Sequence, residues 1–293
     1  MLNQSFFRYL EFEKRFSRHT IVAYQNDLDQ YAAYINSQFE LDDLSQISHT
    51  FIRSWIVSMM DTGMKSKSIN RKISSLKTYY KFLQREGIIA QSPMQKIISP
   101  KTPKRLPQFV EQSQMENLLD EVDFENSFEG YRDRLILEVF YATGIRVSEL
   151  VNLKSANVDT SRMFLKVLGK RNKERIIPIS AELLTTIEQY NRYKQEEGLS
   201  NAEYFFVREN GEAMYTKKVY RMVNAELSKV TSIQKKSPHV LRHTFATHML
   251  NNGADLNAIK EILGHSSLAA TQVYTHNSIE KLKSIYKQAH PKG

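Results

Sequence analysis

The sequence predicts a mainly helical protein with two domains and a small β-sheet in the second. Apolar residues recur at helical spacing along most of the chain, and a basic, proline-containing segment at 99–107 interrupts this pattern. Two short β-like runs, 163–167 and 175–179, flank a polar turn. We therefore expect a helical first domain at 1–98 and a second domain at 108–293, joined by the extended linker 99–107.

Two helices are predicted in the first domain. Ser17 is placed to cap a helix whose apolar positions are Ile21, Tyr24, Leu28, Tyr31 and Ile35. A second helix carries Ile69, Ile73, Leu76, Tyr79, Tyr80 and Leu83, and Gly87 is a plausible stop. The tyrosines in both patterns are read as core residues.

The second domain begins with a predicted capping box at Ser113–Glu116. A further helix through Leu135, Val139 and Ala142 is expected to end at Gly144. The two β-like runs then predict a hairpin whose tip carries Lys170, Arg171 and Lys173. From about residue 181 onward the pattern is again helical.

Composition restricts the function classes. The 293 residues carry a net charge of +9 with a pI near 9.4, which favours a polyanionic partner such as nucleic acid or an acidic membrane surface. The absence of cysteine excludes disulfides, thiolate chemistry and Cys-ligated zinc. The N-terminus does not resemble a signal peptide, and no apolar run has the length of a membrane span, so we expect a cytoplasmic protein.

Positive charge is concentrated between residues 65 and 105, where the sequence has eleven basic residues and one acidic residue, Glu86. A solvated helix surface is the ordinary explanation for such a run. Its one-sidedness, and its continuation into the linker, favour contact with phosphates. The predicted DNA contacts are Arg71, Lys72, Lys101, Lys104 and Arg105.

Several residues have the chemistry that metal-free phosphodiester cleavage requires, namely cations for the transition state, a proton donor for the leaving oxygen and a hydroxyl nucleophile. Arg146 follows a helix break, so its side chain can enter a cleft, and Glu149 can hold it. A surface salt bridge is the alternative for this arginine. Lys170 could be a mobile general acid or an ordinary turn lysine.

His239 and Arg242 are spaced to share one helix face. His239 and His243 have the spacing of a helical zinc motif, but the glutamate that this motif requires is missing, so no metal is expected. His243 and His248 are interpreted as structural histidines. His265 lies in the stretch Leu263-Gly-His-Ser266, and Tyr274 follows it in the stretch Tyr274-Thr-His276. Tyr274 is one of 15 tyrosines, and its hydroxyl needs cationic neighbours to become a nucleophile.

The order and spacing of Arg146, Lys170, His239-x-x-Arg242, His265 and Tyr274 resemble the tyrosine recombinases of the phage-integrase family. Stretches such as Thr143–Leu150 and Ser237–His243, with Ala246-Thr-His248, are similar to the Xer branch, and the resemblance spans essentially the whole chain. It departs at Arg171, where the family often has glycine after the hairpin lysine.

The resemblance implies a role for each residue. Arg146 and Arg242 would clamp the scissile phosphate, and Lys170 would protonate the departing 5′ oxygen. His239 would assist proton transfer at the tyrosine, and His265 would donate a hydrogen bond to a non-bridging oxygen. Tyr274 would form a 3′-phosphotyrosine, with Glu149 in a supporting position. No cofactor or metal is implied.

The resemblance also implies partners and a task. A helical core-binding (SAM-like) domain and a catalytic domain would form a C-shaped clamp around a double-stranded DNA recombination site. Four protomers, as a homotetramer or a heterotetramer with a second recombinase, would exchange a C-terminal helix, predicted here over 278–286. Packing of that helix on its own domain is the alternative. We further expect that the protein resolves chromosome dimers during cell division, with a DNA translocase of the division machinery as a candidate partner. No association with a membrane is expected.

Other functions stay open at this point. An integrase or transposase of a mobile element would use the same residues, and a type IB topoisomerase would use the same chemistry without exchanging strands. A DNA-binding regulator would not need Tyr274. EDTA would inhibit a metallonuclease.

Overall fold

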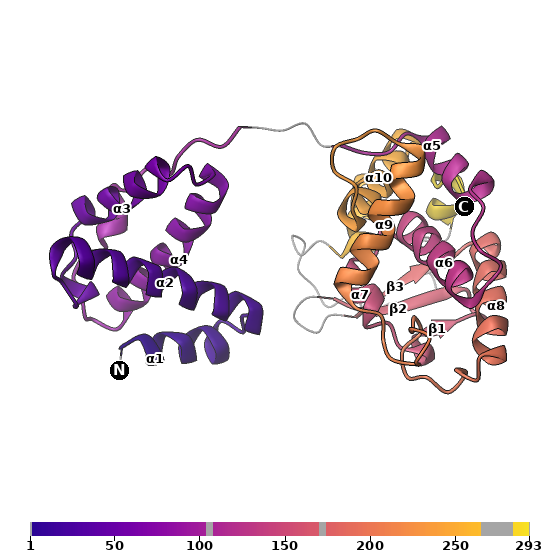
Figure 1. Ribbon diagram of the computed structural model, residues 1–293, viewed down its shortest axis with the longest axis horizontal. Coiled ribbons are helices and arrows are strands. Elements are labelled where there is room, and N and C mark those ends of the chain that lie inside the picture. The colour runs from indigo at the N-terminus through magenta and orange to yellow at the C-terminus, as the bar shows by residue number, and fades with distance from the viewer. Residues whose placement is uncertain (1, 104–107, 170–173, 265–283, 293) are drawn as a thin grey trace. The chain divides into compact units, whose positions relative to one another are not determined.

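The computed structural model describes residues 2–103, 108–169, 174–264 and 284–292. The chain divides into two compact units, 1–105 and 106–293 (Figure 1). The first unit is helical, and the second combines helices with a three-stranded sheet. The predicted fold class is therefore confirmed.

The first unit is built from short and long helices. Its elements are α1 (Leu2–Arg8), η1 (Tyr9–Glu13), α2 (Arg18–Phe39), η2 (Leu44–Gln46), α3 (His49–Asp61), α4 (Ser66–Arg85) and η3 (Pro93–Lys96). Helices α2, α3 and α4 pack against one another around an apolar core. The Oγ of Ser17 accepts a hydrogen bond from the amide of Thr20, which confirms the predicted cap of α2.

The apolar stripe predicted for α4 is confirmed, because all six of its positions are buried. Lys72 lies on the same side of the helix and is itself buried, at 4% exposure. Its ammonium lies 3.0 Å from Oδ1 of Asp27 and donates to Oε1 of Gln30. The prediction that Lys72 contacts DNA is therefore wrong: a charge run in sequence wraps around a helix, and this position faces the core.

Asp27 is the centre of this buried polar cluster. Arg71, whose side chain is half exposed, donates to both carboxylate oxygens of Asp27, and Ser75 donates to one of them. The ammonium of Lys72 also lies 6.0 Å from the centre of the Trp55 ring. The cluster joins α2 to α4 in the interior of the first unit.

Asp27→Asn is expected to lower the free energy of unfolding of the first unit by about 3–5 kcal/mol, because it leaves the buried charge of Lys72 without a carboxylate. Trp55 is the chain's single tryptophan, so its fluorescence during urea unfolding reports on this unit alone. Asp29→Asn, an exposed substitution on the same helix, is the matched control. Equal midpoints for the two variants would contradict the expectation.

The second unit has more elements. They are α5 (Gln112–Glu116), η4 (Asn117–Glu121), α6 (Phe128–Thr143), α7 (Val147–Val151), η5 (Ser155–Asn157), β1 (Val158–Asp159), β2 (Phe164–Leu168), β3 (Glu174–Pro178), α8 (Ala181–Glu196), α9 (Thr216–Val230), α10 (Pro238–Asn251) and α11 (Leu256–Leu263).

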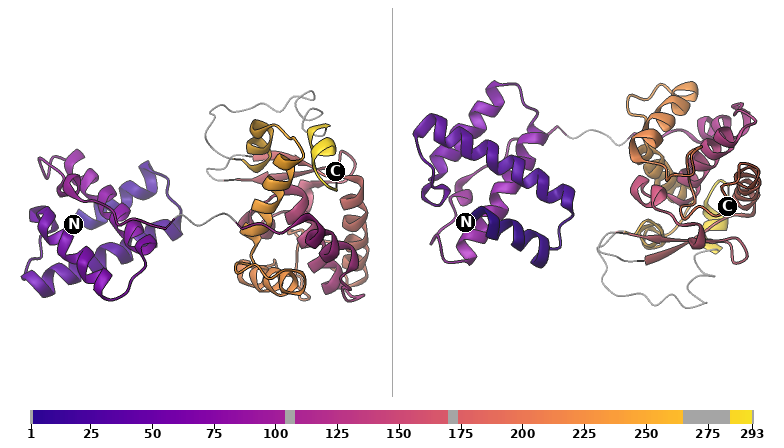
Figure 2. Two further views of the ribbon diagram at one scale, coloured as in Figure 1. Left: turned by 90° about the horizontal axis from the view of Figure 1, so that it is seen from above. Right: turned by 60° about the horizontal axis from the view of Figure 1, so that its bottom comes forward.

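Helix α6 is central to this unit. It packs against α8 and α10 and lies between them in Figures 1 and 2. It ends at Gly144 as predicted, in a left-handed conformation with φ +58°. A Cβ at this glycine would lie 2.6 Å from side-chain atoms of Leu263 and Phe245, so both the backbone angle and the packing require glycine. The predicted capping box at Ser113 is wrong, because α5 begins at Gln112 with Glu111 as its cap.

The sheet has the order β1-β2-β3 and is antiparallel throughout. The predicted hairpin of β2 and β3 is confirmed, with Leu165 opposite Ile177 and Val167 opposite Arg175. All four of these side chains are buried, so an arginine lies on the core face of the sheet. Strand β1 was not predicted, since two residues are too short to show alternation.

The last described segment contributes to the core of its own unit. Residues 284–289 are helical, and Tyr286 and His290 are buried. The two rings stack with centroids 4.9 Å apart, and Nε2 of His290 lies 3.0 Å from the main-chain oxygen of Tyr141. In the parts of the chain that the structure describes, no helix is long and apolar enough to cross a membrane.

Candidate active site

Arg146 lies in the short break between α6 and α7. The left-handed conformation of Gly144 ends α6, and Arg146 is the extended residue before α7, with φ −79° and ψ 148°. Glu149, one turn into α7, accepts from Nη1 of Arg146 at 2.7 Å and from its backbone amide at 2.9 Å. The helix start therefore positions both the main chain and the side chain of this arginine.

Arg242 approaches the same place from α10. Its side chain is buried at 9% residue exposure, and Nη1 and Nη2 donate to the main-chain oxygens of Gly144 and Leu263 at 2.5 and 2.7 Å. Both oxygens are at the C-terminal ends of helices, where the peptide dipoles favour a cation. Burial, followed by the charges of Arg146 and Arg175, lowers the pKa of Arg242 to about 9.

A third arginine completes the cluster. Arg175 is 4% exposed, and its Nη1 and Nη2 bind the two carboxylate oxygens of Glu149 at 2.9 and 2.8 Å. The sequence predicts a strand at this position but does not indicate that this arginine belongs to the site. Burial alone would raise the pKa of Glu149, but Arg175 and then Arg146 lower it to about 2. Two arginines therefore bind one ionised carboxylate, and the charge of Arg242 adds to theirs, so the net positive charge of the cluster suits an anion.

The predicted histidines differ in their surroundings. His239 is exposed in the first turn of α10, and its ring centre lies 6.3 Å from that of Tyr220. His248 is buried, with Nδ1 3.0 Å from the hydroxyl of Tyr141, in agreement with a structural role. Among the described residues, no group of three or more His, Cys, Asp or Glu could hold a metal ion.

Other predicted residues fall outside the described ranges. These are Lys170, His265 and Tyr274 of the predicted catalytic set, and Lys104 and Arg105 of the predicted DNA contacts. Lys101 is described and exposed. Helix α11 ends at Leu263, and Gly264 follows in a left-handed conformation, so the described chain leads up to His265.

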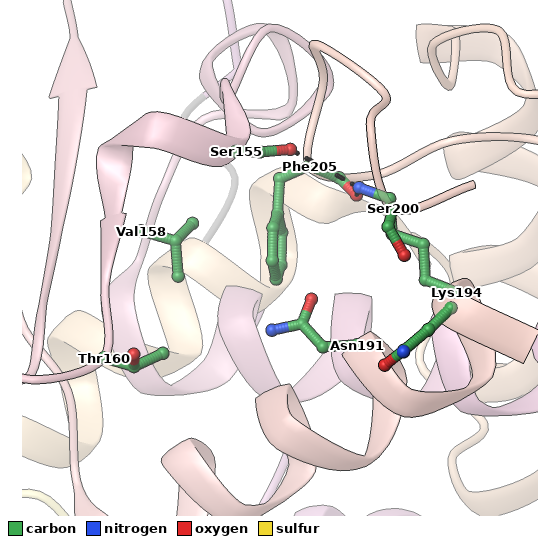
Figure 3. A pocket seen from close by; sticks show the side chains of 8 residues that line it. Ser155, Val158, Thr160, Asn191, Lys194, Ser200 and Phe205 are labelled. Atoms are coloured by element: carbon green, nitrogen blue, oxygen red, sulfur yellow. Dashed lines mark hydrogen bonds between the residues drawn. The ribbon is translucent and has the colours of Figure 1, made fainter. Parts of the chain in front are cut away.

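A separate pocket of about 310 Å³ lies between β1, α8 and the loop before Phe205 (Figure 3). None of the three clustered arginines lines it. Its buried lysine, Lys194, lies 3.4 Å from Oγ of Ser155 and donates to the main-chain oxygens of Tyr204 and Phe205 at 3.1 Å. These contacts occupy the ammonium within the fold, so the arginine cluster is the better candidate site.

Glu149→Gln is expected to destabilise the second unit in a pH-dependent way. The pKa of Glu149 is about 2 in the folded chain against an ordinary 4.5, so its contribution is complete above pH 4.5 and is lost as pH falls towards 2. We expect a deficit of roughly 3 kcal/mol at pH 7 that closes below pH 4.5. Urea unfolding followed by circular dichroism from pH 2.5 to 7 measures this, with exposed Glu188→Gln as control. A deficit independent of pH would contradict it.

Comparison with known proteins places this geometry in a family context. Residues 108–281 match the model described as phage integrase family, and residues 4–87 match the phage integrase N-terminal SAM-like domain. Tyrosine recombinase XerC of Chlorobaculum parvum is 35% identical over 98% of this chain and 94% of that protein. Tyrosine recombinase XerC of Staphylococcus epidermidis is 36% identical over 100% of this chain and 98% of its own length.

Solved structures are similar over nearly the whole chain. XerH site-specific recombinase, in its post-cleavage complex with a palindromic difH substrate, has a TM-score of 0.72 at 18% identity, covering 97% of this chain and 93% of that one. The Tn1549 transposon integrase, in complex with a circular intermediate DNA, has a TM-score of 0.73 at 18% identity, covering 97% and 99%. At this level of identity the likeness is one of fold.

Proposed function

The chain belongs to the phage integrase family of tyrosine recombinases, and from this we propose that its arginine cluster binds the scissile phosphate of a DNA recombination site. The family predicted from the sequence motifs is confirmed, and the chain is a site-specific recombinase of the Xer type that acts on DNA. The observation that carries the proposal is the convergence of Arg146 and Arg242 beside the end of α11.

Both arginines keep donors for a phosphate. A guanidinium has five N–H groups. Arg146 uses one on Glu149 and one, at 3.3 Å, on the oxygen of Gly264. Arg242 uses two on main-chain oxygens. The remaining donors of each can bind the non-bridging oxygens and stabilise the charge that develops on them during displacement.

The proposed reaction is a transesterification. The hydroxyl oxygen of Tyr274 attacks the phosphorus, the bond to the 5′ oxygen breaks, and a 3′-phosphotyrosine forms. Lys170 gives a proton to the departing 5′ oxygen, and His239 helps to remove the tyrosine proton. His265 donates a hydrogen bond to a non-bridging oxygen. The bond energy is retained in the phosphotyrosine, so religation needs neither a metal nor a nucleotide.

Partners and task are part of the same proposal. We infer a tetramer of identical chains, or of this chain with a second recombinase, that resolves chromosome dimers in the cytoplasm, with a DNA translocase as a candidate partner. In a single chain Tyr286 and His290 pack on their own unit, so exchange of the C-terminal helix would have to replace those contacts. Integration of a mobile element is the second candidate, since its chemistry is the same.

Covalent trapping tests the proposal. DNA that stays attached to the protein in detergent is recovered from cells and sequenced, and the site so defined is made with a nick beside the cleavage position. The purified chain is expected to form a detergent-stable adduct with this substrate in EDTA. Failure to form an adduct, or formation that depends on added metal, would rule the proposal out. Relaxation of a supercoiled plasmid without the site would favour a topoisomerase.

A further inference from the structure

Three consecutive main-chain oxygens at the end of α11 each accept a hydrogen bond from a different arginine. The oxygen of Ile262 accepts from Nε of Arg175 at 2.7 Å, and that of Leu263 from Nη2 of Arg242 at 2.7 Å. The oxygen of Gly264 accepts from Nη2 of Arg146 at 3.3 Å. The end of this helix therefore joins the three guanidinium groups, and the chain continues from it to His265.

Arg175 differs from the other two in how it is used. Its Nε and both Nη atoms are engaged, on Ile262 and on the two oxygens of Glu149. Its side chain is 5% exposed, against 22% for Arg146. The position lies on the core face of β3, where the alternation calls for an apolar residue. A buried arginine there is costly to desolvate, so the use of all three of its nitrogens within the fold needs an explanation beyond stability.

Glu149 transmits this contact to Arg146. Oε1 accepts from Nη1 of both arginines, at 2.7 Å from Arg146 and 2.9 Å from Arg175. Oε2 accepts from Nη2 of Arg175 at 2.8 Å and from the backbone amide of Arg146 at 2.9 Å. Arg175 thus holds the carboxylate that orients Arg146. Through Ile262 it also holds the helix end that Arg242 contacts.

We propose that Arg175 is a positioning residue for cleavage, which aligns Arg146 and Arg242 on one phosphate by fixing Glu149 and the end of α11. The inference rests on the proposed function. Strand β3 begins directly after residues 170–173, so the same side chain also joins the strand that follows Lys170 to α7 and α11. Arg175 does not touch the phosphate in this arrangement.

The geometry requires a guanidinium. Two bonds from separate nitrogens to the two oxygens of a carboxylate, and a third from Nε to a carbonyl, match its rigid fork of donors. A lysine keeps the charge but offers three donors from one nitrogen and cannot reproduce that arrangement. The side chain of Arg175 also packs closely against Gly264, because a Cβ on this glycine would lie 3.1 Å from Cδ of Arg175.

The test compares Arg175→Lys with Arg132→Lys in the full chain. Arg132 is also a buried arginine of the second unit, at 1% exposure, but it pairs with Asp133 and Glu209, outside the cluster. Arg175→Lys is expected to slow single-turnover cleavage roughly 10- to 100-fold, a range typical of residues that orient a functional side chain. The dissociation constant for the site should change less than about threefold, because most phosphate contacts are made elsewhere. Arg132→Lys should cleave normally.

A substrate with a methylphosphonate at the scissile position separates positioning from general damage. This group lacks the negative charge that Arg146 and Arg242 meet, so the ratio of the wild-type cleavage rate to the Arg175→Lys rate should shrink towards one. A merely structural defect would leave the ratio unchanged. Arg175→Gln, which keeps a planar donor, is the second variant, and melting temperatures establish that each is folded.

Each outcome decides. The inference would be overturned if Arg175→Lys cleaved DNA as fast as the wild-type chain, or if Arg132→Lys lost as much activity as Arg175→Lys. It would also be overturned if the ratio of wild-type to Arg175→Lys rates were unchanged on the methylphosphonate substrate, or if both Arg175 variants failed to fold. No adduct from the wild-type chain would instead overturn the proposed function.

Discussion

Replacing Tyr274 by phenylalanine is expected to abolish the covalent protein–DNA adduct and to leave DNA binding unchanged. The substitution removes only the hydroxyl oxygen, so no atom remains at that position to attack phosphorus. Affinity for DNA comes mainly from basic side chains that meet phosphates, and none of these changes. The measurement is detergent gel electrophoresis of labelled nicked DNA, with binding followed separately by fluorescence anisotropy.

Tyr215→Phe is the matched control for this variant. Tyr215 is an exposed tyrosine of the same unit, at 46% exposure, and its hydroxyl has no proposed part in the reaction. It should form the adduct at the wild-type rate. An adduct from Tyr274→Phe at a comparable level would mean that another side chain is the nucleophile.

Replacing Arg242 by alanine is expected to lower the single-turnover cleavage rate about 100- to 1000-fold, the range seen when one preorganised donor to a developing charge is removed. Arg242 is buried and is held by the oxygens of Gly144 and Leu263, so its position is set before DNA arrives. The substitution also leaves these two oxygens without that donor, at a cost of about 1–3 kcal/mol each. Cleavage should therefore be measured at a temperature where circular dichroism shows the variant folded.

Arg192→Ala, which removes an exposed arginine from α8, is the control for loss of one positive charge. It should change neither cleavage nor the melting temperature appreciably. A cleavage rate for Arg242→Ala within about tenfold of wild type would show that this guanidinium does not stabilise the transition state.

Much of the fold could be predicted because local signals and packing agree. Gly144 is required both by its left-handed backbone and by the closeness of Phe245, and the sequence showed it as a helix stop. The hairpin of β2 and β3 was visible from its two apolar runs around a polar turn. The start of α5 was misplaced because Glu111 caps it, and a glutamate is a weaker cap signal than Ser113.

The site could be predicted only in part, since tertiary contacts decide it. The spacing of Arg146 and Glu149 within one helix turn was sufficient to predict their contact. Lys72 was misassigned because the charge run does not reveal that its partner is Asp27, on another helix. Arg175 was missed as a site residue, although its place on the core face of a predicted strand was a usable signal. An arginine at an alternation position otherwise filled by Leu, Val and Ile needs a buried partner.

The assignment of Tyr274 as the nucleophile is tested most directly by identifying the residue that carries the DNA. The adduct trapped in EDTA is digested with nuclease and trypsin, and the modified peptide is sequenced by mass spectrometry. We expect the tryptic peptide of residues 261–281, in which Tyr274 is the single tyrosine, with the nucleotide on that tyrosine. A nucleotide on any other residue, or no covalently modified peptide in a sample that has cleaved its DNA, would contradict it.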